Sequence, residues 1–270
     1  MKKTLIALAV AASAVVSGSA MAWQEGDFEG SISMGGNITA PQPAWLWQLG
    51  EQGEDAIDLS LADATQSDGN NVWSNISDYP YTLLLGKTKA EYSSVSSGMA
   101  PIITYSGEGF YIKHPADSAP VVTLTATGKT DVSKKGTLQF KMNTYALVDM
   151  LWKGNGVDTN DKDTYQMIAD TAKTYGNGYF QNAGYVKTMT TDNVKNELSR
   201  MLGGDMITIS ENAVPTQSYT GPNIFNRNDA FNIEGAYGAE YVANSGVLTF
   251  PQNATPNDWI ATLRVTVSYQ

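Results

Sequence analysis

The chain has 270 residues, no cysteine, one histidine and a formal net charge of −10 at pH 7. Without cysteine there are no disulfide bonds and no thiol chemistry, and one histidine cannot complete the common zinc ligand sets. We therefore expect no metal and no cofactor. The acidic balance, with no basic stripe along the chain, argues against nucleic-acid binding.

Residues 1–22 have the pattern of an export signal that is removed. Lys2 and Lys3 form a short basic start, an uncharged apolar stretch covers residues 5–16, and residues 20–22 fit the small-x-small cleavage rule. The apolar stretch is too short for a spanning helix. We expect the mature chain to begin at Trp23.

The first predicted strand covers residues 28–38 and alternates with a period of two. Its even positions are all apolar or glycine: Phe28, Gly30, Ile32, Met34, Gly36 and Ile38. A period of two places these side chains on one face of a strand. No hairpin partner precedes the segment and no tight turn directly follows it. By itself the pattern fits two interpretations about equally: a strand that pairs within its own chain, and a strand that completes a neighbouring molecule.

Further strands are predicted by β-branched and aromatic content. They cover residues 45–50, 81–86, 102–105, 110–112, 121–125, 137–142, 206–209 and 247–250. In residues 137–142 the even positions should face inward. Residues 51–80 are rich in Asp, Gly, Asn and Ser, which indicates loops with short ordered pieces.

Helical patterns occur only in a central insertion at about residues 143–205. Residues 163–173 fit a short helix. Residues 191–202 fit a helix better, because Val194, Leu198, Met201 and Leu202 form one apolar stripe. Thr191 is suited to cap the start of this helix and Gly203 to end it.

The last segment mirrors the first one. Apolar residues occupy its odd positions: Trp259, Ala261, Leu263, Val265, Val267 and Tyr269. This predicts a long terminal strand over residues 259–269. Many short strands separated by turns predict an all-β fold, a sandwich or barrel, as one large domain with an insertion.

The sequence contains no recognisable set of catalytic residues, and we expect that the protein is not an enzyme. His114 lies in a predicted loop without a nearby nucleophile and is interpreted as a solvated side chain. A pair of carboxylates for glycoside hydrolysis has no specific signature in a chain with 27 acidic residues. The alternative to a structural role is a secreted carbohydrate-binding or carbohydrate-active β-sandwich that acts as a monomer.

Several motifs resemble the Fae-type chaperone–usher fimbrial subunits, a family of pilins. The matching segments are 26–31, 35–40, Trp45-x-Trp47-x-x-Gly50, 84–89 and 259–269. They cover the first third of the chain and its last dozen residues in a consistent order. The centre of the chain diverges, so the resemblance does not distinguish a major from a minor subunit.

The resemblance implies an incomplete immunoglobulin-like β-sandwich that is completed by a donor strand from the neighbouring subunit. Residues 23–40 would be the donor-strand extension, and residues 41–270 the pilin domain with a partly helical insertion. The donor side chains would be Phe28, Gly30, Ile32, Met34, Gly36 and Ile38. Affinity would come from ladder hydrogen bonds and specificity from the alternate side chains.

The resemblance also implies partners and a location. These partners are identical or related fimbrial subunits, a periplasmic chaperone and an outer-membrane usher, on a route through the periplasm to the cell-surface fimbria. The groove strand that the chaperone would pair with contains Trp259, Leu263, Val265, Val267 and Tyr269. The family often has a glycine about fourteen residues before the end, where this chain has Asn257.

Members of the family can bind host glycans through the insertion. Aromatic residues there could stack on sugar rings, and the candidates are Trp152, Tyr165, Tyr175 and Tyr179. The alternative, which we favour, is that most of these rings pack the insertion onto the sandwich.

Overall fold

The computed structural model describes residues 45–50, 57–89, 100–113, 115, 118–152, 162–168, 190–207, 213–220 and 229–269. Within 213–220, and at residues 152 and 168, it describes the backbone alone. All of these residues belong to one unit, Pro41–Gln270. The predicted export signal and the alternating segment 28–38 lie outside the described residues. Within the described part, no helix is long and apolar enough to cross a membrane.

The described residues are mostly strands. In chain order the strands are β1 (Trp45–Leu49), β2 (Thr65–Ser67), β3 (Asn70–Ser74), β4 (Tyr81–Thr88), β5 (Pro101–Ser106), β6 (Tyr111–Lys113), β7 (Val121–Gly128), β8 (Lys135–Trp152), β9 (Asp163–Ile168), β10 (Ala213–Thr220), β11 (Ala230–Tyr241), β12 (Val247–Pro251), β13 (Trp259–Ile260) and β14 (Arg264–Tyr269). The helix α2 (Thr191–Leu202) and three single turns, η1 (Leu61–Asp63), η2 (Gly203–Asp205) and η3 (Gln252–Ala254), complete the description.

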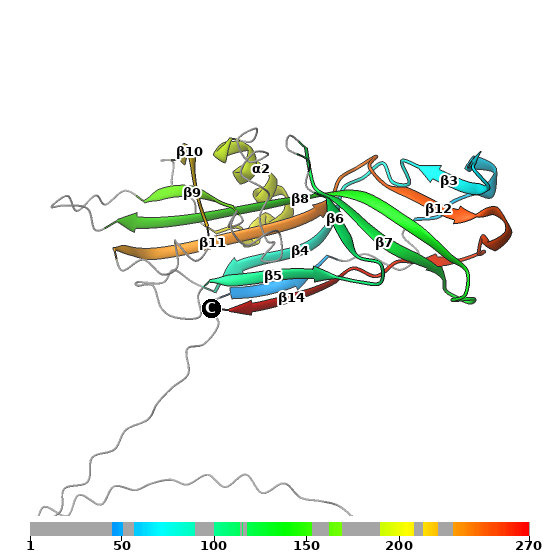
Figure 1. The fold of residues 1–270 in the computed structure, drawn as a ribbon. Helices are drawn as coiled ribbons and strands as arrows, with labels where there is room; N and C mark the ends of the chain where they lie inside the picture. The colour runs from blue at the N-terminus through cyan, green and yellow to red at the C-terminus, as the bar shows by residue number, and fades with distance from the viewer. Residues whose placement is uncertain are drawn as a thin grey trace, which may run out of the picture. The chain divides into compact units, whose positions relative to one another are not determined.

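The large sheet is organised around β8, which has 18 residues. Along the sheet the strand order is β1-β4-β11-β8-β12-β3-β2. The first half of β8 pairs with β7 and β12, and its second half pairs with β9 and β11. Strands β5 and β14 form a separate two-stranded sheet. In Figure 1 this small sheet lies on one side of β4 and β11, and α2 lies on the other side.

Alternation along β8 shows how the layers are built. The even residues Leu138, Phe140 and Met142 are buried in the main core, as the sequence pattern predicts, and the alternation continues through Val148 and Met150. Odd residues of the second half, Tyr145 and Leu147, instead join Val194 and Leu198 of α2 in a second cluster. Because both faces of β8 are covered there, residues 144–150 are all buried.

The predicted helix over residues 191–202 is confirmed with its bounds. Its start differs by one residue: the side chain of Thr190, not Thr191, accepts a hydrogen bond from the backbone N–H of Asn193. Thr191 itself is buried. At the other end Gly203 has φ +55°, a left-handed conformation that suits glycine at a helix end.

Polar contacts tie α2 and the turn after it to the large sheet. Glu240 on β11 is buried, and its carboxylate accepts hydrogen bonds from Arg200 of α2 and from the Tyr145 hydroxyl, the latter at 2.7 Å. Lys87 on β4 pairs with Asp205 at 2.7 Å. Because Glu240 is buried with charged and neutral donors around it, its charge is compensated rather than isolated.

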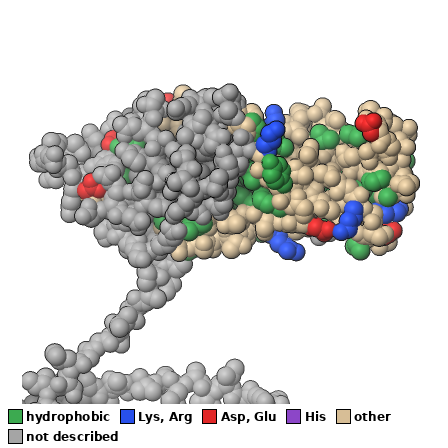
Figure 2. Space-filling view, viewed as in Figure 1, with side chains coloured by type: hydrophobic (Ala, Val, Ile, Leu, Met, Phe, Trp, Pro, Cys, Tyr) green, Lys and Arg blue, Asp and Glu red, His purple; other side chains and the backbone are tan. Residues whose placement is uncertain are grey.

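Figure 2 shows acidic and basic side chains dispersed over the described part of the visible face. They do not gather into a basic patch there.

Four predictions from the central and terminal segments are wrong. Residues 163–168 form strand β9 instead of a helix, because Tyr165 and Met167 alternate beside β8. Residues 143–152 belong to β8 and not to an insertion. Met206 and Ile207 lie outside any strand. The terminal segment is two strands, because the chain leaves β7 after Ile260 and joins β5 at Arg264.

Shortening Leu198 tests whether α2 is part of the folded core. Its side chain is fully buried, so Leu198→Ala should lower the free energy of unfolding by about 2–5 kcal/mol, since the cavity persists after the change. The control is Asn196→Ala at an exposed position of the same helix, which should change stability by less than about 0.5 kcal/mol. Urea unfolding followed by circular dichroism measures both. Equal effects would show that α2 does not pack as described.

A buried pair of tyrosines predicts a loss of stability at alkaline pH. The hydroxyls of Tyr105 and Tyr237 lie 2.7 Å apart between the layers, and burial raises the pKa of Tyr105 above its usual value. In the unfolded chain the Tyr105 hydroxyl would ionise near pH 10, whereas in the folded chain it stays neutral to higher pH. The contribution of Tyr105 to the free energy of unfolding is therefore complete below pH 10 and is lost as the pH rises further. Tyr105→Phe should reduce the decline in unfolding free energy above pH 10 by up to about 1.4 kcal/mol per pH unit. Tyr111→Phe, at an exposed ring, is the control and should leave the slope unchanged.

Candidate functional site

The small sheet has two described strands, β5 and β14, and neither pairs with a third described strand. Strand β14 pairs with β5 from Arg264↔Ser106 to Tyr269↔Pro101, and no other described strand pairs with β14. The inward residues of β5, such as Ile103 and Tyr105, are buried. Their partners on β14, Val267 and Val265, are only half-buried. Although neither strand has a second partner in the described part of the chain, the inward side chains of β14 are thus less covered than those of β5.

Strand β1 of the large sheet lies opposite β14 and also has an unpaired edge in the described part of the chain. It pairs with β4, and no other described strand pairs with it. Its inward residues become more exposed along the strand: Trp45 is buried, Trp47 is half-buried, and Leu49 is 63% exposed. The indole N–H of Trp47 donates a hydrogen bond of 2.8 Å to the Tyr269 hydroxyl. This contact joins the two strands that bound the opening.

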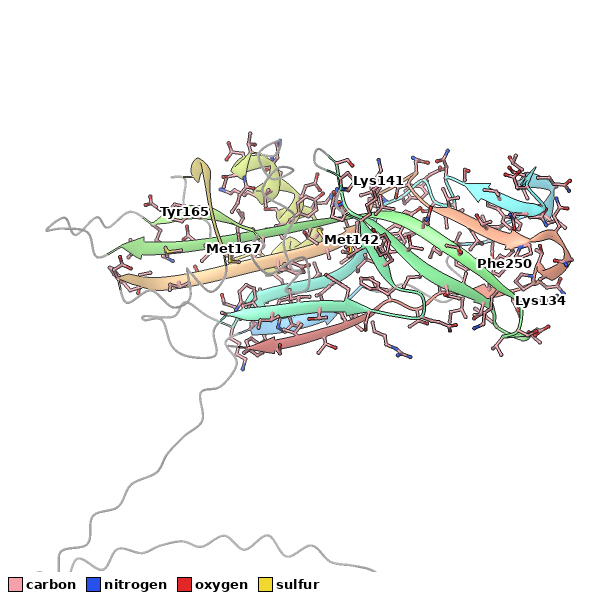
Figure 3. All side chains as sticks on the ribbon, in the orientation of Figure 1. Lys134, Lys141, Met142, Tyr165, Met167 and Phe250 are labelled. Carbon is pink, nitrogen blue, oxygen red and sulfur yellow. The ribbon has the colours of Figure 1, made fainter. Side chains whose placement is uncertain are left out.

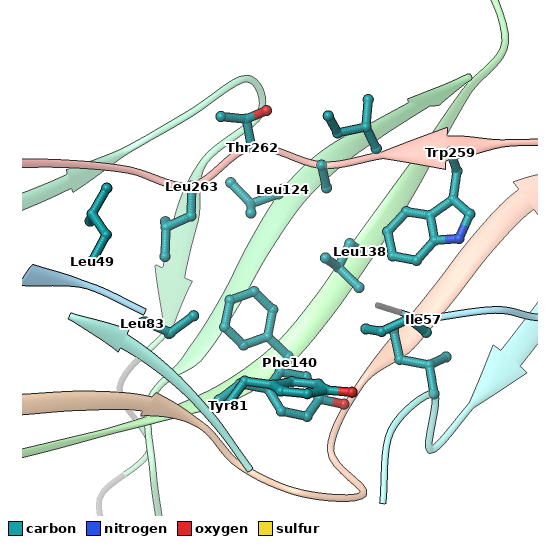
Figure 4. A pocket seen from close by; sticks show the side chains of 14 residues that line it. Leu49, Ile57, Tyr81, Leu83, Leu124, Leu138, Phe140, Trp259, Thr262 and Leu263 are labelled. Carbon is teal, nitrogen blue, oxygen red and sulfur yellow. The ribbon is translucent and has the colours of Figure 1, made fainter. Parts of the chain in front are cut away.

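An apolar cavity of about 580 Å³ opens at the Leu49 end. Figure 4 shows its side chains converging from the sheet and from the segment between β13 and β14. The lining residues are Leu49, Ile57, Ile76, Tyr81, Leu83, Leu124, Leu138, Phe140, Tyr241, Trp259, Ile260, Ala261, Thr262 and Leu263. None of these described lining residues is charged. We call the cavity, together with the space between β1 and β14, the acceptor groove.

Local irregularities in two strands shape the acceptor groove. The pairing of β4 with β11 passes from Leu84↔Ala239 to Thr82↔Glu240 and skips Leu83, which is a β-bulge. A bulge turns a side chain away from the regular alternation, and Leu83 lines the cavity. On the opposite wall, residues 261–263 belong to no strand. Their backbone therefore belongs neither to the pairing of β13 with β7 nor to the pairing of β14 with β5.

The acceptor groove is suited to binding an apolar strand, because its described lining residues are uncharged and mostly apolar. An open strand edge presents backbone donors and acceptors to a further strand, and the cavity beside it can bury alternate side chains. Among the described residues no group of three or more acidic or histidine side chains is placed to bind a metal ion. Its lining contains no acid–base pair. His114 lies outside the described residues.

The predicted groove-strand residues have different positions in the structure. Trp259 and Leu263 line the cavity. Val265, Val267 and Tyr269 alternate along β14, as predicted. The predicted donor residues from Phe28 to Ile38 lie outside the described residues.

Of the four candidate receptor contacts, only Tyr165 has a described side chain. Tyr165 is 5% exposed in the main core, and its hydroxyl donates to Asp163. In Figure 3 it lies on β9 beside β8. The prediction of a sugar contact is wrong for Tyr165, because its ring packs inside the fold. Tyr175, Tyr179 and the side chain of Trp152 lie outside the described residues.

Sequence analysis missed the deeper wall of the acceptor groove. Tyr81, Phe140 and Tyr241 were predicted as strand residues or not singled out, yet they line the cavity. The alternation of Trp45, Trp47 and Leu49 was a usable signal for β1 as its second wall. No local pattern shows that β1 lies opposite β14, because the two are more than 200 residues apart.

Comparison with known proteins identifies the family. A family described as "Fimbrial, major and minor subunit" matches residues 1–270. The chain is 26% identical over 274 residues to the K88 minor fimbrial subunit FaeI of Escherichia coli, covering 100% of both chains. It is 28% identical over 291 residues to the F41 fimbrial protein of Escherichia coli, again over 100% of both chains.

A third similarity covers part of the chain. The K88 fimbrial protein AC of Escherichia coli is 37% identical over 142 residues, which are 52% of this chain and 46% of that protein. The whole-chain match to the family agrees with the motifs found at both ends of the sequence. The chain belongs to the K88-type family of major and minor fimbrial subunits.

Proposed function

We propose that this fimbrial subunit is assembled by the chaperone–usher pathway through donor-strand exchange. In this proposal the described domain is an incomplete immunoglobulin-like sandwich. Residues 23–40 of one subunit form the donor-strand extension, and its segment 28–38 fills the acceptor groove of the next subunit. The observation that supports it most directly is the open edge of β14 beside an apolar cavity of about 580 Å³.

The donor segment and the acceptor groove are chemically matched. Phe28, Ile32, Met34 and Ile38 would each contribute about 1.5–3 kcal/mol on full burial, which is about 6–12 kcal/mol as an upper limit. Ladder hydrogen bonds with β14 would add about 0.5–1.5 kcal/mol each. A chain without cysteine can therefore form a durable contact between subunits through packing and strand pairing.

The proposal includes transient partners and a route. Before assembly a periplasmic chaperone would pair with β14 and cover the acceptor groove, and an outer-membrane usher would catalyse its replacement by the next subunit. The mature subunit would pass through the periplasm to the cell-surface fimbria. No catalytic step by this chain is part of the proposal.

A change of one donor residue tests the exchange and its register. Ile32→Asp would bury a carboxylate without a partner, which costs several kcal/mol, so fibre growth should fall at least tenfold. Chaperone binding should persist, because it uses β14 rather than the donor segment. The control is Ser33→Asp on the opposite strand face, which should polymerise normally. Polymer length after release from the chaperone measures both variants, and normal polymers from Ile32→Asp would refute the register.

Moving the donor segment tests the incomplete fold directly. Transfer of residues 23–40 to the C-terminus through a short flexible linker should give a monomer with a higher melting temperature, since the segment can fill its own acceptor groove. The same transfer with Ile32→Asp is the control and should lose the gain. A stable, soluble monomer that lacks residues 23–40 altogether would instead favour a secreted carbohydrate-binding or carbohydrate-active protein.

For adhesion to host glycans, the proposal rests on the sequence between β8 and α2. With Tyr165 buried, the remaining candidates are Trp152, Tyr175 and Tyr179. Because residues 143–152 are part of the central strand β8, a deletion of the whole insertion would destroy the fold. The sharper test is Tyr175→Ala with Tyr179→Ala on a glycan array, where retained binding would refute these contacts.

A further inference from the structure

Two acidic side chains and one lysine meet where β9, β8 and β11 lie side by side (Figure 1). Asp149 on β8 is directly opposite Glu234 on β11 in the strand pairing. Two carboxylates directly across a strand pair repel each other, so they need a compensating charge. Lys162, the residue before β9, supplies it, because its Nζ lies 3.5 Å from Asp149 Oδ2 and 3.2 Å from Glu234 Oε2. We call these three side chains the lysine triad.

A β-bulge in β11 sets which residue faces Asp149. The pairing of β11 with β8 passes from Phe231↔Leu151 to Glu234↔Asp149, with one extra residue on β11. Within this bulge Asn232 has φ +52°, a left-handed conformation that is uncommon outside glycine. Bulges re-aim side chains and are frequent beside active sites. Here the bulge brings a second carboxylate to the lysine.

Asp149 is the most enclosed member of the lysine triad, with an exposed fraction of 0%. The hydroxyl of Thr164, its partner on β9, donates a hydrogen bond of 2.8 Å to Asp149 Oδ1. This leaves Oδ2 beside the lysine. The side chains of Lys162 and Glu234 are 19% and 15% exposed. The lysine triad therefore has one closed carboxyl group and one side from which protons and water can leave.

The chemistry of the lysine triad differs from that around Glu240, the other buried carboxylate described above. Glu240 is compensated by the guanidinium of Arg200, which stays protonated and is not a nucleophile. A lysine amine that loses its proton to a neighbouring base is a nucleophile. In the lysine triad such a base, Glu234, lies beside the amine, and a second carboxyl group lies within reach of it.

We propose that the lysine triad forms an intramolecular amide bond between Lys162 and Asp149. Glu234 takes a proton from the ammonium, and the neutral Nζ attacks Cγ of Asp149 while Thr164 holds Oδ1. The nitrogen gives up two protons in all, Glu234 passes them to Oδ2, the Cγ–Oδ2 bond breaks and one water leaves. No oxidant or cofactor is consumed.

Burial favours the amide over the ion pair. The reaction removes one positive and one negative charge from a site where keeping them is costly. The enclosure of Asp149 also keeps water away from the new bond. The bond ties β8 to the start of β9 in a chain without cysteine. This inference does not depend on donor-strand exchange.

The intact mass of the full mature chain tests the amide bond. After unfolding in denaturant, the mass should be lower than the sequence mass by one water molecule. Trypsin should release residues 142–153 joined to residues 154–173, because it does not cleave after an acylated Lys162. The full sequence mass, or a loss of water within one unlinked peptide, would overturn the proposal. A link from Lys162 to residues 228–264, which contain Glu234, would overturn the assigned roles.

Variants separate the amide bond from a plain ion pair. Lys162→Arg keeps the positive charge but has no nucleophilic amine, so it should have its full mass. Glu234→Gln cannot carry a proton and should slow the condensation by about a hundredfold. The matched control is Lys87→Arg in the more exposed ion pair with Asp205, which should still lose one water.

Circular dichroism checks that each variant folds. A loss of water that persists in folded Lys162→Arg would overturn the proposal. If neither variant of the lysine triad folds, the mass and the peptide map of the unmodified chain decide the question.

Discussion

The open edge of β14 is the constraint on which the rest of this structure depends. An edge strand with apolar side chains is a liability in a soluble protein, because it invites pairing with other chains. Here β14 pairs with β5 on one side only, and the apolar cavity is lined by the residues directly before β14, up to Leu263. Val265 and Val267 of β14 are only half-buried, although their partners on β5, Tyr105 and Ile103, are buried. In the proposed function, this edge is where one fimbrial subunit binds the next.

The two faces of the large sheet are covered by different elements. Helix α2 buries the outer face of β8 and β11, and its polar contacts to Glu240 and Lys87 attach it to the sheet. The inner face of the same strands supports the small sheet and the cavity. In the described part of the chain, the apolar cavity lies on this inner side, with Leu49 of β1 exposed at its end.

Aromatic residues divide the opening into unequal parts. Trp45 and Trp47 lie over glycines of β11 and β4, so a flat sheet surface accommodates two large rings. Where these rings reach Tyr269, the layers are joined. Beyond Leu49 and Leu263 they are not, and the cavity opens. The position of these rings thus depends on glycines in two other strands, β11 and β4, and no single segment of the sequence determines it.

The sequence by itself determined the class of fold, most strands, the helix over 191–202 and the family. These features depend on short-range alternation, on an apolar stripe and on motifs near both ends of the chain, all of which are local. Tertiary structure alone decided that residues 163–168 form a strand, because it is their pairing with β8 that places Tyr165 and Met167 in the core. It also decided that the terminal segment divides between β7 and β5, and that Trp47 meets Tyr269. Such contacts join residues far apart in the chain, and no local periodicity encodes which edge is left without a neighbour.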